Sequence, residues 1–268
     1  MTNNESERFL SGQVAVVTGG GRGIGREIAR QLAAVGARVV VTARTLSQLE
    51  ETRELIASEG GLCSTVQMDV LDEVSVSTAF REILEVNGHV DLLVNNAGIS
   101  GKSGAPWELD TEDWWRTMEV NLRGPYLCSK VVIPDMIERK RGRIIMVGSN
   151  MAFWPYPVAS AYSCSKAGLV RLGDNLAVAL KEHGIAVFTI SPGLVRTEMT
   201  KDIPEEFVAD AEWTPIEKPA ELCVALASGK ADALTGRYIH SSEHDLDELI
   251  ARAEEIEGKN LQTMRLVE

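Results

Sequence analysis

The sequence lacks a long uncharged apolar stretch, although 44% of its 268 residues are hydrophobic. No window approaches the roughly 20 consecutive apolar residues that a membrane-spanning helix needs. Residues 1–11 carry Glu5, Glu7 and Arg8 but no apolar core, so we expect no secretory signal there. These absences predict a cytoplasmic protein without a membrane partner.

Basic residues and cysteines are also scarce. The chain has 27 lysines and arginines against 39 acids, a formal net charge of −12, so we expect no nucleic-acid partner. Cys63, Cys128, Cys164 and Cys223 form neither a CxxC pair nor a zinc-ligand spacing. We therefore expect four buried or half-buried thiols and no disulfide framework.

Short β-branched runs alternate with longer helix-like segments. Most of these runs are apolar without alternation, which is typical of strands covered on both faces. We expect strands at residues 14–17, 38–41, 64–67, 91–94, 143–147 and 185–190, and a last strand within 235–240. Repeated β-α-β units with right-handed crossovers predict an α/β fold, a doubly wound, mostly parallel Rossmann-like sheet of about seven strands with helices on both faces.

The expected helices show apolar stripes or capping residues. One stripe begins at Ile24 and stops at Gly36, and Thr111 is a plausible helix start with a hydroxyl cap. No linker or repeat divides the chain, so we expect a single domain over 1–268 with a flexible start at 1–11. The segment 241–268 is expected to be a helical tail whose charged helix places Leu246, Leu249, Ile250, Ala253 and Ile256 on one side.

A glycine-rich turn follows the first predicted strand and opens the first predicted helix. It reads Thr-Gly-Gly-Gly-Arg-Gly-Ile-Gly at residues 18–25. Glycines let the chain turn tightly and let backbone amides approach a pyrophosphate at a helix N-terminus. We expect dinucleotide phosphate binding here, and a merely flexible loop is the alternative. The expected contacts are Gly19, Arg22, Gly23, Ile24 and Gly25.

Tyr162 and Lys166 lie four residues apart, so on a helix their side chains share one face. Free tyrosine has a pKa of about 10, and a nearby cation lowers the pKa toward the range useful in proton transfer. From this motif alone, the alternative is an amphipathic helix with both residues on its wet edge. Ser149 after the fifth strand, Asn95 at the end of the fourth and Asn121 on the next helix favour chemistry, because ligands of such sheets bind at the carboxyl ends of strands.

With these motifs in this order and spacing, the sequence from about residue 12 to 199 resembles the short-chain dehydrogenase/reductase family. The resemblance implies that Tyr162 is the general acid for carbonyl reduction and the general base for alcohol oxidation. It implies that Lys166 lowers the pKa of Tyr162 and binds the nicotinamide ribose, that Ser149 orients the substrate oxygen, and that Asn121 holds a water of the proton relay.

The resemblance also implies cofactor contacts along the strand ends. For Asn95 a purely structural turn is the alternative. The implied contacts at the adenine are Asp69 and Val70, and those beside the adenine ribose are Asn95, Ala97 and Gly98. At the nicotinamide end they are Pro192, Gly193, Val195 and Thr197. Tyr162, Lys166 and the glycine loop are implied contacts as well.

The end of the second strand distinguishes NADP from NAD. NAD enzymes of this fold place an acid there for the ribose 2′-hydroxyl, whereas an arginine suits a 2′-phosphate. Ala43 stands where the acid is expected, Arg44 follows it, and Arg22 is a second cation within reach. We expect NADP, with NAD as the alternative if the two arginines are merely solvated.

Apolar residues flank the expected catalytic pair. They predict a pocket wall and hence a hydrophobic small-molecule ketone or secondary alcohol as substrate, with core or subunit packing as the alternative. These residues are Met151, Phe153, Trp154, Tyr156, Leu194 and Met199. Beyond them, Ser-Ser-Glu-His-Asp at 241–245 replaces the glycines of many relatives, and we interpret His240 and His244 as a helix cap and solvated face rather than a metal site.

We therefore expect an NADP-dependent oxidoreductase that interconverts a ketone and a secondary alcohol, with no metal. The alternatives are an NAD-dependent alcohol dehydrogenase, a 3-oxoacyl-thioester reductase, or a non-catalytic dinucleotide sensor. A sensor needs no proton relay, which argues against the last. The resemblance further implies a homodimer or homotetramer formed through the long helices around 111–139 and 158–183.

Overall fold

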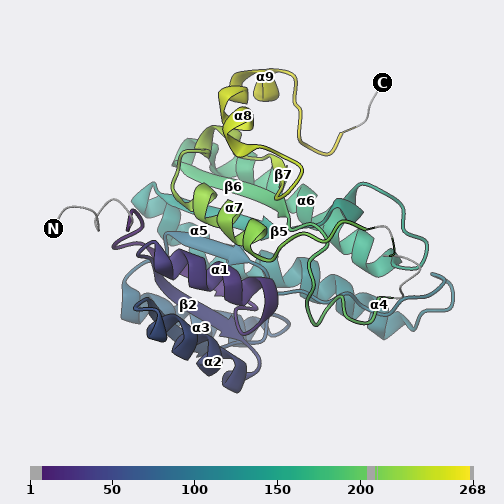
Figure 1. Ribbon diagram of the computed structural model, residues 1–268, viewed down its shortest axis with the longest axis horizontal. Coiled ribbons are helices and arrows are strands. Elements are labelled where there is room, and N and C mark those ends of the chain that lie inside the picture. Colours follow the sequence, from purple (N-terminus) through teal and green to yellow (C-terminus); the bar gives the residue numbers. More distant parts are fainter. Residues whose placement is uncertain (1–7, 204–208, 210, 266–268) are drawn as a thin grey trace.

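The computed structural model describes residues 8–203, 209 and 211–265. Its seven strands form one sheet in the order β3-β2-β1-β4-β5-β6-β7 (Figure 1). Every neighbouring pair is parallel. The strands are β1 (Val14–Thr18), β2 (Arg38–Ala43), β3 (Leu62–Gln67), β4 (Leu92–Asn95), β5 (Gly142–Val147), β6 (Ile185–Ser191) and β7 (Tyr238–His240).

Helices connect the strands as crossovers. The main helices are α1 (Gly23–Ala34), α2 (Leu46–Ser58), α3 (Glu73–Asn87), α4 (Thr111–Met118), α5 (Gly124–Arg139), α6 (Ser160–Leu180) and α7 (Glu217–Ala227). Asp110, rather than a hydroxyl, caps α4, because its Oδ1 accepts from the amides of Glu112 and Asp113 at 3.0 and 3.1 Å.

The two faces of the sheet carry separate apolar clusters, because successive side chains of a strand point to opposite faces. On β1, Val17 belongs to the cluster beneath α1, α2 and α7, whereas its neighbour Val16 belongs to the cluster beneath α3, α5 and α6. Figure 1 shows α1 and α7 next to each other on one face of the sheet. This arrangement confirms the predicted doubly wound α/β fold.

The strand order reverses between β1 and β4. From β1 the chain proceeds outward through β2 to β3, and it then returns to place β4 on the other side of β1, with Val94 beside Val17. The loops after β1 and β4 consequently diverge at the carboxyl edge of the sheet. In doubly wound folds this reversal opens the crevice in which ligands bind.

The expected flexible start and the expected C-terminal tail both contribute residues to the core. Leu10, within the expected flexible start, is 1% exposed, and its amide donates to the Val35 carbonyl at 3.0 Å; residues 1–7 lie outside the description. The single helix expected after residue 245 is in fact two short helices, α8 (Leu246–Ala251) and α9 (Ala253–Gly258), because Arg252 leaves the helical conformation at φ −103° and ψ 14°. Both helices contribute to the core beneath α7, through Leu249 and Ile256.

All four cysteines fall in the described part of the chain and are free thiols. Cys128 and Cys223 are buried and Cys63 is half-buried, and burial raises the pKa of each, to about 12 for Cys63 and Cys128. The expectation is wrong for Cys164, which is exposed because its position on α6 faces solvent while Lys166 faces inward. Among the described helices, none is long and apolar enough to cross a membrane.

Candidate active site

The glycine-rich turn lies at the carboxyl end of β1, where it bends the chain into α1. Gly19 and Gly23 have φ values of 66° and 54°, in the left-handed region that favours glycine. A Cβ atom on Gly25 would lie 2.4 Å from the Gly19 carbonyl oxygen, so no side chain fits there. Arg22 is the residue before α1. In the described part of the chain, its side chain makes no hydrogen bond that caps this helix. The first amides of α1 are therefore left for another acceptor.

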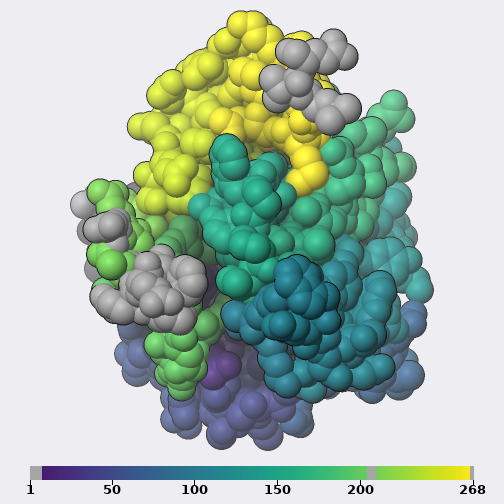
Figure 2. Space-filling view, turned by 90° about the vertical axis from the view of Figure 1, so that its right-hand side faces the viewer, coloured from purple at the N-terminus to yellow at the C-terminus, as the bar shows by residue number. Residues whose placement is uncertain are grey.

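A cleft of about 570 Å³ opens in front of this turn. Figure 2 shows the face on which it opens, with purple N-terminal atoms visible between green and teal segments. Its volume lies within the range of small-molecule and cofactor pockets. Most of the predicted cofactor residues line it, namely Gly19, Arg22, Gly23, Ile24, Gly25, Arg44, Asp69, Val70, Ala97, Gly98 and Thr197.

Six predicted cofactor residues do not line this cleft: Asn95, Tyr162, Lys166, Pro192, Gly193 and Val195. Asn95 is buried, and its Nδ2 donates to Ser129 Oγ of α5 at 3.1 Å. Val195 is buried as well. The contacts of Asn95 are those of a structural residue that fastens β4 to α5, the alternative interpretation of this position.

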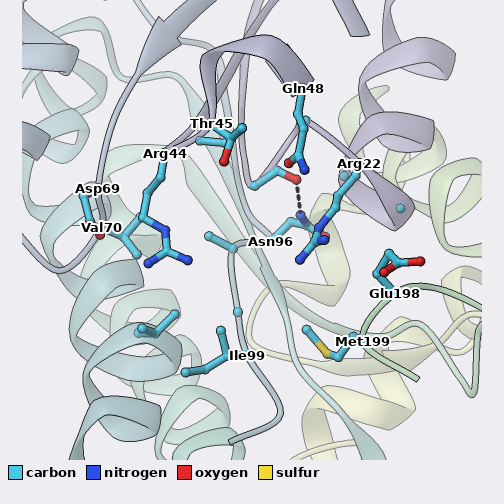
Figure 3. A pocket seen from close by; sticks show the side chains of 18 of the residues that line it. Arg22, Arg44, Thr45, Gln48, Asp69, Val70, Asn96, Ile99, Glu198 and Met199 are labelled. Atoms are coloured by element: carbon cyan, nitrogen blue, oxygen red, sulfur yellow. Dashed lines mark hydrogen bonds between the residues drawn. The ribbon is translucent and has the colours of Figure 1, made fainter. Parts of the chain in front are cut away.

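The rim of the cleft is cationic at the end of β2. Figure 3 shows that Arg44 and Arg22 extend from opposite sides toward the same open space. Ala43, Thr45 and Gln48 line the cleft beside them. Sequence reasoning missed Thr45 and Gln48, although their place directly after Arg44, where α2 begins, is a signal that could have identified them.

Thr18 and Asn96 fasten the glycine turn to the end of β4. Thr18 Oγ1 accepts from the amides of Asn96 and Ala97, both at 3.0 Å. Asn96 Nδ2 in turn donates to the carbonyl of Thr18 at 2.9 Å. Neither side chain was assigned a role from the sequence, because reciprocal contacts between two strand ends leave no spacing pattern. They hold the two divergent loops at a fixed distance.

Tyr162, Lys166 and Ser149 converge at the carboxyl end of β5. Lys166 Nζ donates to the Val147 carbonyl at 2.8 Å and lies 5.5 Å from the centroid of the Tyr162 ring. The Ser149 side chain lies near enough to the Tyr162 hydroxyl to oppose the rise in its pKa. Ser149 Oγ accepts from the Met151 amide at 3.2 Å, which fixes the turn that follows β5. The phenol, the ammonium and the hydroxyl therefore form one cluster.

Burial dominates the electrostatics of this cluster. Burial raises the pKa of Tyr162, while the nearby Ser149 side chain opposes that shift. Burial also lowers the pKa of Lys166 to about 8. The expected lowering of the pKa of Tyr162 by a nearby cation is thus not found among the chain's own groups, because desolvation of the phenolate outweighs the favourable contacts.

Asn121 lies in a π-helical turn, Glu119–Arg123, which interrupts the long helix expected over 111–139. Its Oδ1 accepts from the Ile99 amide at 2.9 Å, and its Nδ2 donates to the Ile99 carbonyl at 2.9 Å and to Ser165 Oγ at 3.0 Å. Ser165 Oγ donates to the Tyr162 carbonyl at 2.7 Å. Both Nδ2 hydrogens of Asn121 are therefore engaged, and its Oδ1 already accepts one hydrogen bond.

Gly98 connects this cluster to the cleft. It lines the cleft, and a Cβ atom built on it would lie 3.2 Å from Asn121 Oδ1 and 3.8 Å from Lys166 Nζ. Of the four predicted catalytic residues, Asn121 and Lys166 therefore lie directly behind the wall formed by Gly98, and Lys166 lies beside the Tyr162 ring. The structure brings the predicted catalytic cluster and most of the predicted cofactor residues to one edge of the sheet.

Of the residues predicted to form an apolar pocket wall, Met199 lines the cleft, whereas Phe153, Trp154 and Leu194 do not. The Phe153 ring packs edge-on against Tyr238 of β7, with centroids 4.7 Å apart, and so has a structural contact. Trp154 is 67% exposed, and Met199 is exposed and lines the cleft. Leu194 accepts a hydrogen bond from the Thr214 amide through its carbonyl at 2.8 Å. The cleft therefore has an apolar side at Met199.

Comparisons with known proteins agree with this geometry. The family model for short chain dehydrogenases matches residues 13–207. A short chain dehydrogenase of Pseudocercospora fijiensis is 34% identical, and the match covers 97% of this chain and 90% of the relative. A 3-oxoacyl-[acyl-carrier-protein] reductase of Aquifex aeolicus is also 34% identical, and that match covers 86% of this chain and 96% of the relative. Among solved structures, this chain is similar to a gluconate 5-dehydrogenase from Burkholderia cenocepacia in complex with NADP and tartrate. The TM-score is 0.80 at 28% identity, and the match covers 87% of this chain and 95% of the other.

Proposed function

Because the chain belongs to the short-chain dehydrogenase family, we propose that it uses NADP to interconvert a ketone and a secondary alcohol, with Tyr162 as the acid–base residue. The convergence of Tyr162, Lys166 and Ser149 behind Gly98 carries this proposal. A phenol held beside a hydroxyl and an ammonium is suited to moving one proton at a substrate oxygen.

The cleft fits a dinucleotide. The close packing at Gly25 lets α1 begin beside the cleft, and the first amides of this helix suit a diphosphate. Asp69 and Val70 line the part of the cleft beside Arg44, where an adenine would lie. Arg44 and Arg22 carry the charge and the fork geometry that a 2′-phosphate requires. These features support NADP over NAD.

When bound, the nicotinamide ring supplies or accepts the hydride. The residues of the chain handle the proton and the substrate. In the reducing direction Tyr162 donates the proton to the carbonyl oxygen, and in the oxidising direction it accepts the proton of the alcohol. Ser149 hydrogen-bonds the same oxygen and holds it near the phenol. Lys166, fixed by the Val147 carbonyl, stabilises the phenolate that remains after donation.

The substrate would enter beside Met199, an exposed apolar side chain that lines the cleft, which favours an apolar small molecule. A second candidate is a 3-oxoacyl thioester, because the Aquifex aeolicus relative is a 3-oxoacyl-[acyl-carrier-protein] reductase. A panel that contains simple hydrophobic ketones and a 3-oxoacyl thioester separates the two. The higher kcat/KM identifies the class.

The decisive experiment follows NADPH oxidation over that panel for the wild type and for Tyr162→Phe. We expect the variant to lose about 10²- to 10⁴-fold in kcat, which is the range for removing a general acid, and to bind NADPH as the wild type does. Tyr126→Phe is the matched control, because Tyr126 is exposed on α5. Full turnover by Tyr162→Phe would refute the mechanism, and an inactive wild type that still binds NADPH would favour a dinucleotide sensor.

A further inference from the structure

The segment between β6 and α7 leaves the sheet and returns to it through a narrow neck. The outgoing arm of the neck is residues 193–196, and the returning arm is residues 213–214. The Thr214 amide donates to the Leu194 carbonyl at 2.8 Å. Gly193 has a φ value of 74°, and a Cβ atom on it would overlap Thr214 Oγ1. The two arms therefore touch at the base of the segment, at a position that only glycine permits.

Further from the sheet, side chains join the same two arms. The guanidinium of Arg196 lies over the indole of Trp213, 4.1 Å from the ring centroid. This contact is favourable because the cation faces the negative face of the ring and the planar guanidinium packs flat on it. Arg196 is exposed and Trp213 is half-buried, so the stack lies at the protein surface. It forms the outer contact of the neck.

The residues directly after Arg196 form a tight turn. Thr200 Oγ1 accepts from the Thr197 amide at 2.9 Å and donates to the Val195 carbonyl at 2.8 Å. The Met199 amide donates to Thr197 Oγ1 at 3.2 Å. The shape of the turn is therefore fixed by its own hydrogen bonds, whereas its position depends on the arm that carries it.

This turn forms one wall of the cleft, which Thr197, Glu198 and Met199 all line. Figure 3 shows Glu198 and Met199 on the side opposite Arg44. The atom nearest to a Cβ built on Gly23 would be Thr197 Cγ2, at 3.5 Å, so Thr197 lies against the glycine turn. A shift of the outgoing arm would therefore move Thr197 away from the place where α1 begins.

We propose that Arg196 and Trp213 are positioning residues for the cofactor. Their stack holds the neck closed, and the closed neck keeps Thr197 at the glycine turn. Neither side chain lines the cleft, so both act through the neck rather than by touching the dinucleotide. Without the stack, the hydrogen bond from Thr214 to Leu194 would open more often, and the affinity for a dinucleotide that needs the closed neck would fall with the closed fraction. This inference rests on the dinucleotide binding of the proposed function and not on its chemistry.

The test uses paired variants of the full chain. Arg196→Met removes the cation and keeps the length of the side chain, whereas Trp213→Leu removes the ring and keeps the charge. Arg196→Lys and Trp213→Phe are the conservative variants, because each retains one partner of a cation–π contact. Arg81→Met is the control for losing one positive charge from a protein that binds an anion, because Arg81 is exposed on α3 and does not line the cleft.

Two measurements report the neck and the site separately. Hydrogen exchange at the Thr214 amide, in protein without dinucleotide, reports opening of the neck, and fluorescence titration gives the Kd of NADPH. We expect Arg196→Met and Trp213→Leu each to exchange this amide about 2- to 10-fold faster and to raise the Kd by about the same factor, the effect of losing a cation–π contact near the surface. The conservative variants should lie between these and the wild type, and Arg81→Met should match the wild type.

The double variant Arg196→Met/Trp213→Leu should bind NADPH no more weakly than the poorer single variant, because both changes remove the same contact. Additive effects on the Kd would overturn the stack as the cause. Faster exchange with an unchanged Kd would show a merely structural role and would overturn the inference too. If the wild type and both single variants bind NADPH equally, this inference fails while the proposed function stands, whereas a wild type that binds no dinucleotide refutes both.

Discussion

Arg44 occupies the position that separates the two nicotinamide dinucleotides, and it extends over the cleft in the absence of any acid at Ala43. Replacing it by alanine removes a charge-assisted contact to a 2′-phosphate and leaves a 2′-hydroxyl unaffected. We expect Arg44→Ala to weaken NADPH binding about 10- to 100-fold while NADH binding changes little. Fluorescence titration of both dinucleotides measures this difference.

Arg53→Ala is the matched control for this substitution. Arg53 is also on the β2–α2 side of the molecule but forms an ion pair with Glu50 at 2.6 Å on the outer surface of α2. We expect this variant to bind both dinucleotides as the wild type does. If Arg44→Ala weakened NADPH and NADH to the same extent, Arg44 would not be the 2′-phosphate contact.

Individual residues were predictable where spacing along the chain determines proximity. Tyr162 and Lys166 share a helix face, and Ser149 follows the adjacent strand, so their convergence follows from the expected elements. The raised pKa of Tyr162 was not predictable, because it results from burial by residues distant in the sequence. For the same reason the sequence carried no sign that Ser129 would bind Asn95.

Two elements, the π-helical turn and α6, are joined by a single hydroxyl. Ser165 Oγ accepts from Asn121 Nδ2 and donates to the Tyr162 carbonyl, and both Asn121 and Ser165 are 0% exposed. Ser165→Ala would leave one Asn121 donor buried without a partner. We expect the free energy of unfolding to fall by about 1–3 kcal/mol and kcat to decrease, because Asn121 and Tyr162 lose their common contact.

Urea unfolding and steady-state kinetics measure the two effects. Ser163→Ala is the control, because Ser163 lies on the same helix and its hydroxyl donates only within it, to the Ser160 carbonyl at 3.3 Å. The linking role of Ser165 would be contradicted if both alanine variants lost the same stability and the same kcat.

The predicted elements agree with the structure where local pattern dominates. The apolar runs located the five central strands to within a few residues, because strands covered on both faces must be apolar along their length, whereas the edge strand β3 is largely exposed and polar. The π-helical turn could not be predicted, because contacts of Asn121 with Ile99 and Ser165 stabilise it. The break at Arg252 likewise depends on how α8 and α9 each reach the core.

At the scale of the whole molecule, dinucleotide binding should stabilise the fold. A ligand at 100 times its Kd adds about 2.7 kcal/mol, which raises the Tm of a chain of this size by several degrees. We expect NADPH to raise the Tm more than NADH does at equal concentration. Differential scanning calorimetry measures both shifts, and equal shifts would contradict a preference for NADP. In Arg44→Ala the NADPH shift should fall toward the NADH shift.

The architecture of the whole chain was predictable because one physical requirement, covering both faces of a parallel sheet, repeats with every β-α unit. The C-terminal segment obeys no such repeat. Its sequence showed a charged amphipathic helix, whereas its path along β7 depends on contacts with Arg171 and Asp174 of α6. Its helical character was expected from the sequence, and the structure has two short helices there, but the path of the segment along β7 was not predicted.

His244 and Gln262, which accept from the outward amides of β7, follow that strand in the chain, and this order has a consequence for biosynthesis. A nascent polypeptide that has left the ribosome only as far as His240 can already add β7 to β6, but the acceptors from His244 and Gln262 are still inside the ribosome. During that interval the newly made sheet presents two unsatisfied amides to neighbouring chains on the same messenger. A chain that ended between His240 and His244 would keep the residues of the candidate active site but would lack both acceptors for the amides of Tyr238 and His240.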